Sequence, residues 1–207
     1  MKSEKHVVAL HEAGHLLVVL STPLKQFLES ARIFEVLEGW AGEVRLNKEF
    51  DSERLPETRV FTIANGLARP LAQIEYYPES IPEELSSLIN KNKKSVLFAA
   101  RLNLKDKLDI WGHWWRDLDE WSANCKRPRA GPDEEYRSIE REIVRVLSEE
   151  KARRCISFLK DALLAKHELT GDEIRRLPLD FPTFNFPEKI WPDTFLEDIE
   201  ALTRQSR

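Results

Sequence analysis

Five consecutive residues near the N-terminus carry the side chains with the clearest chemistry in this sequence. They read His11-Glu12-Ala13-Gly14-His15, and apolar residues flank them on both sides. On a helix, residues four apart lie on one face, so both imidazoles can point at a single metal ion. Glu12 would then lie beside the ion, where its carboxylate can take a proton from an attacking water and pass it to a leaving amine.

This spacing is the H-E-x-x-H pattern of zinc metallopeptidases. The leucine- and valine-rich flanks predict a buried helix, and two histidines and a glutamate on a buried helix need partners or a metal. The alternative is a core helix whose polar side chains are satisfied by hydrogen bonds within the protein. We therefore expect a zinc-dependent metalloendopeptidase, with Glu12 as the catalytic base and His11 and His15 as ligands of Zn²⁺.

A third ligand must come from another part of the chain, because a catalytic zinc takes three protein ligands and keeps an open position. Asp117 is preferred, since it lies beside the apolar stripe of a predicted helix around Trp111–Cys125. His113 is its main rival, being four residues earlier on a similar face. His113 could instead support a ligand from behind or stabilise the oxyanion. The remaining candidates are Asp119, Glu75 and His167.

Length and composition fit one soluble domain with a real core, with or without an appendage. The chain has 207 residues, of which 42% are hydrophobic and 33% charged. A net charge of -4 argues against nucleic acid as a partner. The sequence has no long apolar run that would predict a membrane span. The two cysteines, Cys125 and Cys155, are too few for a disulfide scaffold and suggest a reducing cytoplasm.

The N-terminal half is expected to place the motif on a helix beside two strands. The helix should run from Ser3 or Glu4 to about Leu20, because Pro23 follows closely. Partial alternation over 31–46, interrupted by glycines at 39–42, predicts two short strands with a turn or bulge at that interruption. An open strand edge next to the zinc helix can pair with an extended peptide substrate.

The rest of the chain is expected to be mostly helical. Apolar residues at helical spacing predict a helix over 56–77, one or two helices over 83–105, and one long helix that begins at Pro132. Thr170 to Glu173 reads as a capping box that opens a short helix through Leu177. Residues 178–192 should be extended and held by aromatic side chains, before a last short helix that ends near residue 203.

Four segments give the chain a family resemblance. They are His11–His15, which reads HEAGH; Ile63–Ala68, rich in small residues; Gly112–Leu118, which contains Asp117; and Ala162–Ile174. In this order they resemble segments of the peptidase domain of the FtsH-type membrane AAA proteases. The resemblance implies a mostly helical (α+β), zincin-like domain with a small sheet beside the zinc helix. It also implies that Asp117 is the third zinc ligand.

The sequence departs from this family in three places. Arg69-Pro70 replaces the family's glutamate after the small-residue run, the gap from Gly112 to Asp117 is one residue longer, and no P-loop ATPase module precedes the motif. We therefore expect an ATP-independent enzyme that acts on peptides or unfolded proteins, or one that works with a separate unfoldase. The hexamers of the family suggest a homo-oligomer.

The expected organisation is an FtsH-like peptidase domain at 1–177, with a Pro/aromatic-rich C-terminal extension at 178–207 packed on it. Two other interpretations stay open. One is a catalytically weak or inactive protein that keeps the fold and serves as a binding or regulatory module. The other is a peptidase of narrow specificity, whose extension covers the cleft as a lid or pro-segment.

Overall fold

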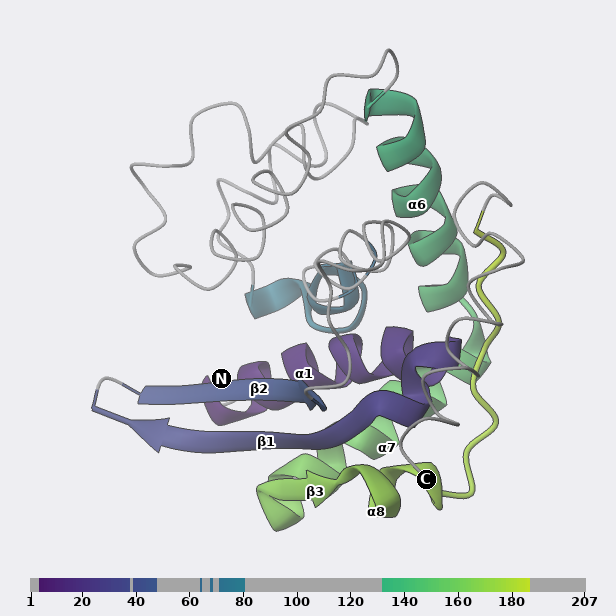
Figure 1. Cartoon of the computed structure of the whole chain (residues 1–207). Helices are drawn as coiled ribbons and strands as arrows, with labels where there is room; N and C mark the ends of the chain where they lie inside the picture. Colours follow the sequence, from purple (N-terminus) through teal and green to yellow (C-terminus); the bar gives the residue numbers. More distant parts are fainter. Residues whose placement is uncertain are drawn as a thin grey trace.

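The computed structural model describes residues 4–37, 39–47, 64, 68, 71–80 and 132–186. Its elements, in chain order, are α1 (Glu4–Leu20), η1 (Pro23–Phe27), β1 (Leu28–Val36), β2 (Gly39–Leu46), η2 (Pro78–Ser80), α6 (Pro132–Leu147), α7 (Glu150–Lys166), β3 (Glu168–Thr170) and α8 (Gly171–Arg175) (Figure 1). Residues 71–76 are also helical. The expected α+β class is confirmed, as helices combined with one small antiparallel sheet.

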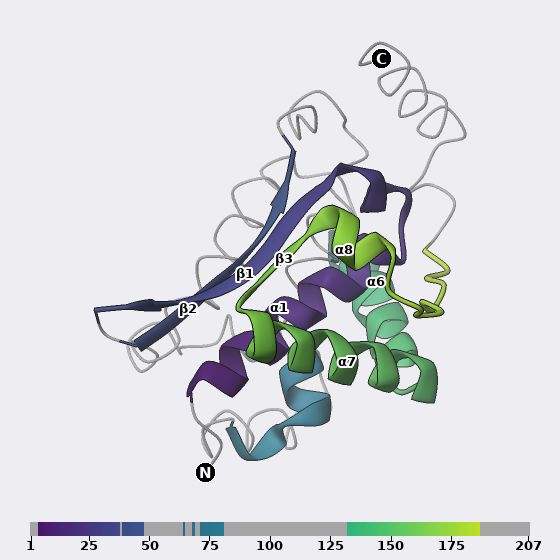
Figure 2. The same cartoon turned by 90° about the horizontal axis from the view of Figure 1, so that it is seen from below.

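Helix α1 lies in the core, packed against α7 and against the strands β1 and β2. Every residue from Ala9 to Leu20 is buried. The helix contacts α7, β1 and β2, and Figure 2 shows α1 and α7 running next to the sheet. A helix covered on several sides needs apolar residues nearly all round, as this sequence has. The predicted helix is confirmed, and it ends at Leu20 as expected.

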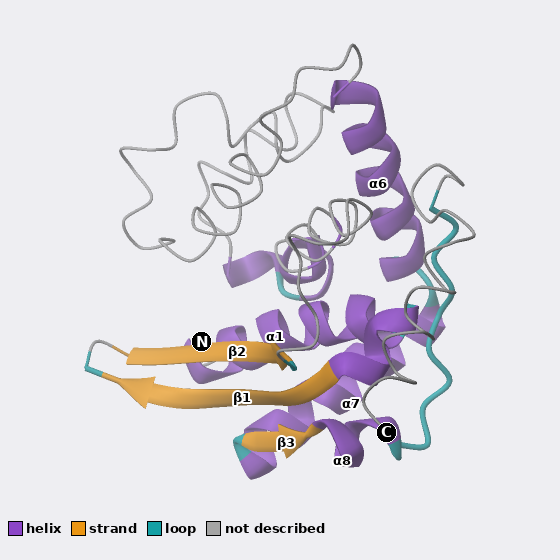
Figure 3. Ribbon diagram, in the orientation of Figure 1, coloured by secondary structure: helices purple, strands orange, loops and turns teal. Residues whose placement is uncertain are grey.

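The three strands pair in the order β2-β1-β3, all antiparallel (Figure 3). In the central strand β1, Ala31 and Ile33 are buried, whereas Arg32 between them is half-buried. This alternation gives the sheet one apolar face toward the core and one polar face toward solvent. The prediction of two strands after the first helix is therefore confirmed, and they form a hairpin.

The turn of this hairpin does not lie where the sequence predicted it. The glycines at 39 and 42 were expected to interrupt the strands, but both lie inside β2, and pairing extends to Val36↔Gly39. Gly39 has a φ of 139°, which L side chains rarely adopt. Gly39 thus allows the backbone conformation of the chain reversal at the start of β2. The register irregularity lies at the other end, between Leu28 and Ser30.

The prediction of one long helix from Pro132 is wrong, because the structure has two helices there. Helix α6 ends at Leu147 and α7 begins at Glu150. The predicted apolar face is confirmed, since its residues are all buried: Ile139, Ile143, Leu147, Cys155, Ile156, Leu159 and Leu163. Leu147 and Cys155 are eight residues apart, which continues the helical period across the break. The pattern therefore carried no sign of the interruption.

The capping box at Thr170 is confirmed in full. The Thr170 hydroxyl accepts from the Glu173 backbone N–H at 3.2 Å, and the Glu173 carboxylate accepts from the Thr170 N–H at 2.9 Å. Helix α8 ends at Arg175, two residues before the predicted end. Strand β3 was not predicted, because three residues are too few to show a period of two.

Residues 178–186 have no regular secondary structure, as the sequence predicted for this stretch. They run alongside α6 and form the yellow end of the coloured ribbon in Figure 1. The Arg145 guanidinium donates to the Thr183 carbonyl at 3.1 Å, and the Asn185 N–H donates to the Glu142 carboxylate. In this described stretch the extension is therefore attached to α6.

Other predicted elements lie outside the described residues. These are the helix over 83–105, the helix around 111–125, the last helix near residue 203 and most of the helix over 56–77, of which Ala64 and Ala68 are helical and fully buried. In the described part of the chain, no helix is both long enough and apolar enough to cross a membrane.

Candidate metal centre

The three side chains of the predicted motif lie together in the core. Their exposed fractions are 5% for His11, 1% for Glu12 and 9% for His15. Removing polar or charged groups from water is costly unless they are hydrogen-bonded, paired or bound to a metal. The first helix therefore places three titratable side chains in the core, where each needs a hydrogen bond, an ion pair or a metal ion.

The two imidazoles lie side by side, as residues one helical turn apart should. Their ring centroids are 5.6 Å apart, and the planes are nearly perpendicular at 82°. His11 Nε2 lies 3.8 Å from Glu12 Oε1, which is too far for a hydrogen bond. This nitrogen is buried and makes no hydrogen bond to the part of the chain that the structure describes. A buried imidazole nitrogen of this kind fits a metal ligand.

Strand β2 holds Glu12 in place through a close backbone approach at Gly42. A Cβ added to Gly42 would lie 2.5 Å from Glu12 Cγ and 2.7 Å from Glu12 Oε1. Only glycine lets the strand pass this near to the carboxylate. Sequence reasoning treated Gly42 as part of a turn and missed this role. Its signal was a glycine inside a strand pattern, which often marks close approach of another group.

The outer edge of β2 is the second feature of the site. β1 pairs with one edge of β2, and no strand in the described residues pairs with the other. An open edge presents backbone N–H and C=O groups that can pair with an extended peptide. Because the Gly42 backbone lies against the Glu12 side chain, a peptide paired with this edge of β2 would pass close to the Glu12 carboxylate.

The preferred third ligand and its main rival lie outside the described residues, as does one further candidate: Asp117, His113 and Asp119. Within the residues that the structure does describe, no three His, Cys, Asp or Glu side chains are grouped so that they could hold a metal ion. Neither of the two described candidates, Glu75 and His167, therefore joins His11 and His15 in such a group.

These two candidates have other surroundings. Glu75 lies 4.0 Å from the Arg153 guanidinium, on the side of the molecule where α7 and residues 75–77 line one cavity. His167 ends α7 in a left-handed conformation with φ of 64°, and its Nε2 lies 2.5 Å from Lys5 Nζ. The Trp40 ring packs edge-on against His167, with centroids 5.5 Å apart. His167 thus joins the end of α7 to α1 and to the start of β2.

Comparison with known proteins assigns no family: no protein-family model matches the chain, and no curated protein matches it. The resemblance to the FtsH-type peptidase domain therefore rests on the four sequence segments. Of these, His11–His15 and Ala162–Ile174 lie in described residues, on α1 and across α7, β3 and α8. Helices α1 and α7 contact each other directly.

Proposed function

We propose that this protein is a zinc-dependent metallopeptidase of the zincin-like, FtsH-peptidase type that hydrolyses peptides or unfolded chains without ATP. The observation that carries the proposal is the pair of buried imidazoles on α1 with the Glu12 carboxylate beside them. His11 and His15 would hold the metal, and Asp117 is the proposed third ligand, with His113 as its rival.

Each side chain has a distinct task in this reaction. A zinc ion bound there would polarise the scissile carbonyl and make water more acidic. Glu12 would take the proton of the attacking water on its carboxylate and donate it to the nitrogen of the leaving amine. Its 1% exposure and the contact with β2 at Gly42 restrict its carboxylate, so little reorganisation is needed during proton transfer.

The open edge of β2 supports an extended peptide as substrate. Main-chain pairing requires no particular side chain, so it suits unfolded segments of many sequences. The requirement is that the substrate be extended over several residues. Folded proteins would then be cleaved only in flexible segments or after a separate unfoldase has opened them.

Metal content is the first test. Purified wild type is expected to hold about one zinc per chain by elemental analysis. His15→Ala and Asp117→Ala should hold much less. His6→Ala is the matched control, because it removes an imidazole from the same helix but from a different face. It should retain zinc like wild type.

The outcomes separate the possible assignments. Wild type without zinc after reconstitution would overturn the metallopeptidase proposal. Zinc retained in Asp117→Ala but lost in His113→Ala would make His113 the third ligand. Zinc bound by wild type with no hydrolysis of unfolded casein would favour the second reading, a protein that keeps the site but serves as a binding or regulatory module.

A further inference from the structure

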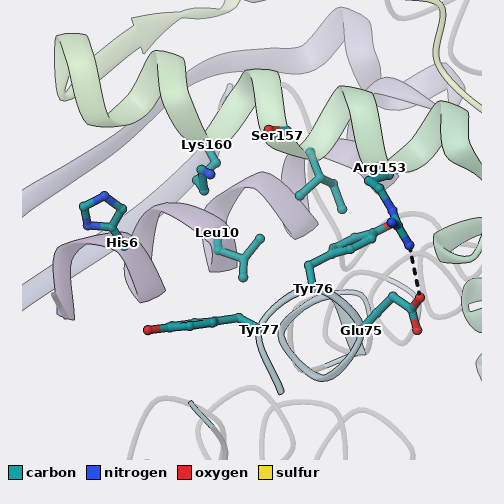
Figure 4. Close-up of a pocket in the computed structure, with 9 residues that line it drawn as sticks. His6, Leu10, Glu75, Tyr76, Tyr77, Arg153, Ser157 and Lys160 are labelled. Atoms are coloured by element: carbon teal, nitrogen blue, oxygen red, sulfur yellow. Dashed lines mark ion pairs between the residues drawn. The ribbon is translucent and has the colours of Figure 1, made fainter. Parts of the chain in front are cut away.

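A cavity of about 280 Å³ lies between α1, α7 and residues 75–77 (Figure 4). His6 and Leu10 contribute the α1 side. With 3.6 residues per turn, they point roughly 100–180° around the helix from His11 and His15. The cavity is therefore separate from the candidate metal centre.

The cavity has an apolar floor. Leu10 of α1 and Ile156 of α7 are its aliphatic lining residues. The rings of Tyr76 and Tyr77 lie beside and below Leu10 in Figure 4. The Tyr76 hydroxyl donates to the Leu147 carbonyl, which fixes its ring. Burial raises the pKa of Tyr76 above its usual range, so this wall stays neutral.

One stripe of α7 supplies hydrogen-bond donors above this floor. Arg153, Ser157 and Lys160 follow each other at the i, i+4, i+7 spacing that places them on one helix face. The Arg153 guanidinium lies over the Tyr76 ring at 5.8 Å and 4.0 Å from the Glu75 carboxylate. Within the described residues it makes no hydrogen bond, so its donors remain available to a ligand.

The charges limit what the cavity can accept. Lys160 Nζ pairs with the exposed Asp161 carboxylate at 3.1 Å, an exchangeable contact in water. Glu75 lines the same space and would repel an ion that carries two negative charges. A single carboxylate carries half that charge, so Glu75 repels it less while Arg153 and Lys160 attract it. The volume lies just below the usual range of roughly 300–1,000 Å³ for ligand pockets, so the ligand must be small.

We infer that this cavity binds a small monocarboxylate with an apolar body. The carboxylate would accept from Arg153, Ser157 and Lys160, and the apolar body would lie between Leu10 and the tyrosine rings. This placement matches each half of the ligand to the wall of its own polarity. The inference does not depend on the zinc site or on peptide hydrolysis.

Titration calorimetry on the full chain tests this with benzoate as the probe. We expect saturable binding of one benzoate per chain, with no binding of the neutral isostere benzamide. Arg153→Gln and Lys160→Gln should each weaken benzoate at least fivefold. Arg154→Gln is the matched control, because this exposed neighbour on α7 does not line the cavity. It should bind benzoate like wild type.

A filled cavity gives a second, independent readout. Ser157 is exposed, so Ser157→Trp can place an indole in the cavity without disturbing the core, and it should abolish benzoate binding. Circular dichroism would establish that each variant is folded. The inference is overturned if wild type shows no saturable binding, if benzamide binds equally well, if phosphate binds more tightly than benzoate, or if the cavity variants bind like Arg154→Gln.

Discussion

Helix α1 carries two polar sites of opposite physical character. On one side, His11, Glu12 and His15 are almost fully removed from water. On the other, the cavity beside His6 is lined by side chains such as Arg153, which is 58% exposed. A buried polar group costs free energy unless it is satisfied, whereas an exposed cation costs almost nothing. The buried groups of the first site therefore need specific interactions. The exposed groups of the second site can accept a ligand but are also stable in water.

The largest expected effect comes from the buried side. Glu12→Gln should lower kcat/KM for an unfolded peptide 10²–10⁴-fold, roughly the contribution of a positioned acid–base group. Zinc content should stay at the wild-type level, because both imidazoles remain. Glu75→Gln, on the cavity side, is the control and should keep full activity. If Glu12→Gln hydrolysed the peptide at the wild-type rate, Glu12 would not be the catalytic base.

Burial also separates neighbouring positions on α7. Leu159 is fully buried and Phe158 is 43% exposed. Leu159→Ala should lower the free energy of unfolding by about 2–5 kcal/mol, through lost burial and the cavity left behind. Phe158→Ala should change it by only about 0.5 kcal/mol. Denaturant titration of both variants measures the difference, and equal costs would mean that α7 does not pack as described.

The close approach at Gly42 joins the buried site to the sheet. Gly42→Ala forces its new methyl against Glu12, so we expect a loss of about 1–3 kcal/mol in unfolding free energy and reduced peptidase activity. Ala41→Ser is the control, since its side chain points to the opposite face of β2.

A double-mutant cycle with Glu12→Ala tests the cause. If the clash with the carboxylate is responsible, the stability cost of Gly42→Ala should be much smaller once that side chain is shortened. An unchanged cost would place the strain elsewhere in β2. The cycle thereby distinguishes a specific contact from a general weakening of the strand.

The sequence predicted best those features that depend on short-range spacing. The i, i+4 histidines, the apolar face of the two later helices and the capping box at Thr170 each follow from local geometry. The break at 148–149 was missed because the helical period of apolar residues continues across it. The hairpin turn was misplaced because Gly42, which serves a contact with Glu12, looked like a turn residue.

Long-range features were beyond such reasoning. Strand β3 exists because Leu169 pairs with Ala31, more than 130 positions earlier in the chain. The cavity on α7 likewise combines three segments that no local pattern connects. The third ligand is of the same kind, because spacing alone could rank Asp117 above His113 but could not bring either to the histidines. That assignment stays a prediction.

A smaller effect is expected at the capping box, where both partners are largely solvent-accessible. Thr170→Ala removes the hydroxyl that accepts from the Glu173 N–H, and should cost about 1 kcal/mol of unfolding free energy. Thr170→Ser keeps an accepting oxygen and should recover most of it. If serine were as destabilising as alanine, the loss would come from the strand β3 and not from the cap.

The smallest effect concerns the pH dependence of the same cap. The Lys166 ammonium, followed by the Thr170 N–H and hydroxyl, lowers the pKa of Glu173 from 4.5 to about 2. A carboxyl whose folded pKa is depressed stabilises the fold above its unfolded pKa, and this contribution is lost as pH falls from about 4.5 toward 2. The difference in unfolding free energy between wild type and Glu173→Gln should therefore shrink across that window.

Because Glu173 is reached by solvent, the change should also weaken in high salt. Lys166→Met removes the largest cause, so an NMR titration should find the Glu173 pKa closer to its ordinary value; an unchanged pKa would assign the shift to the cap alone.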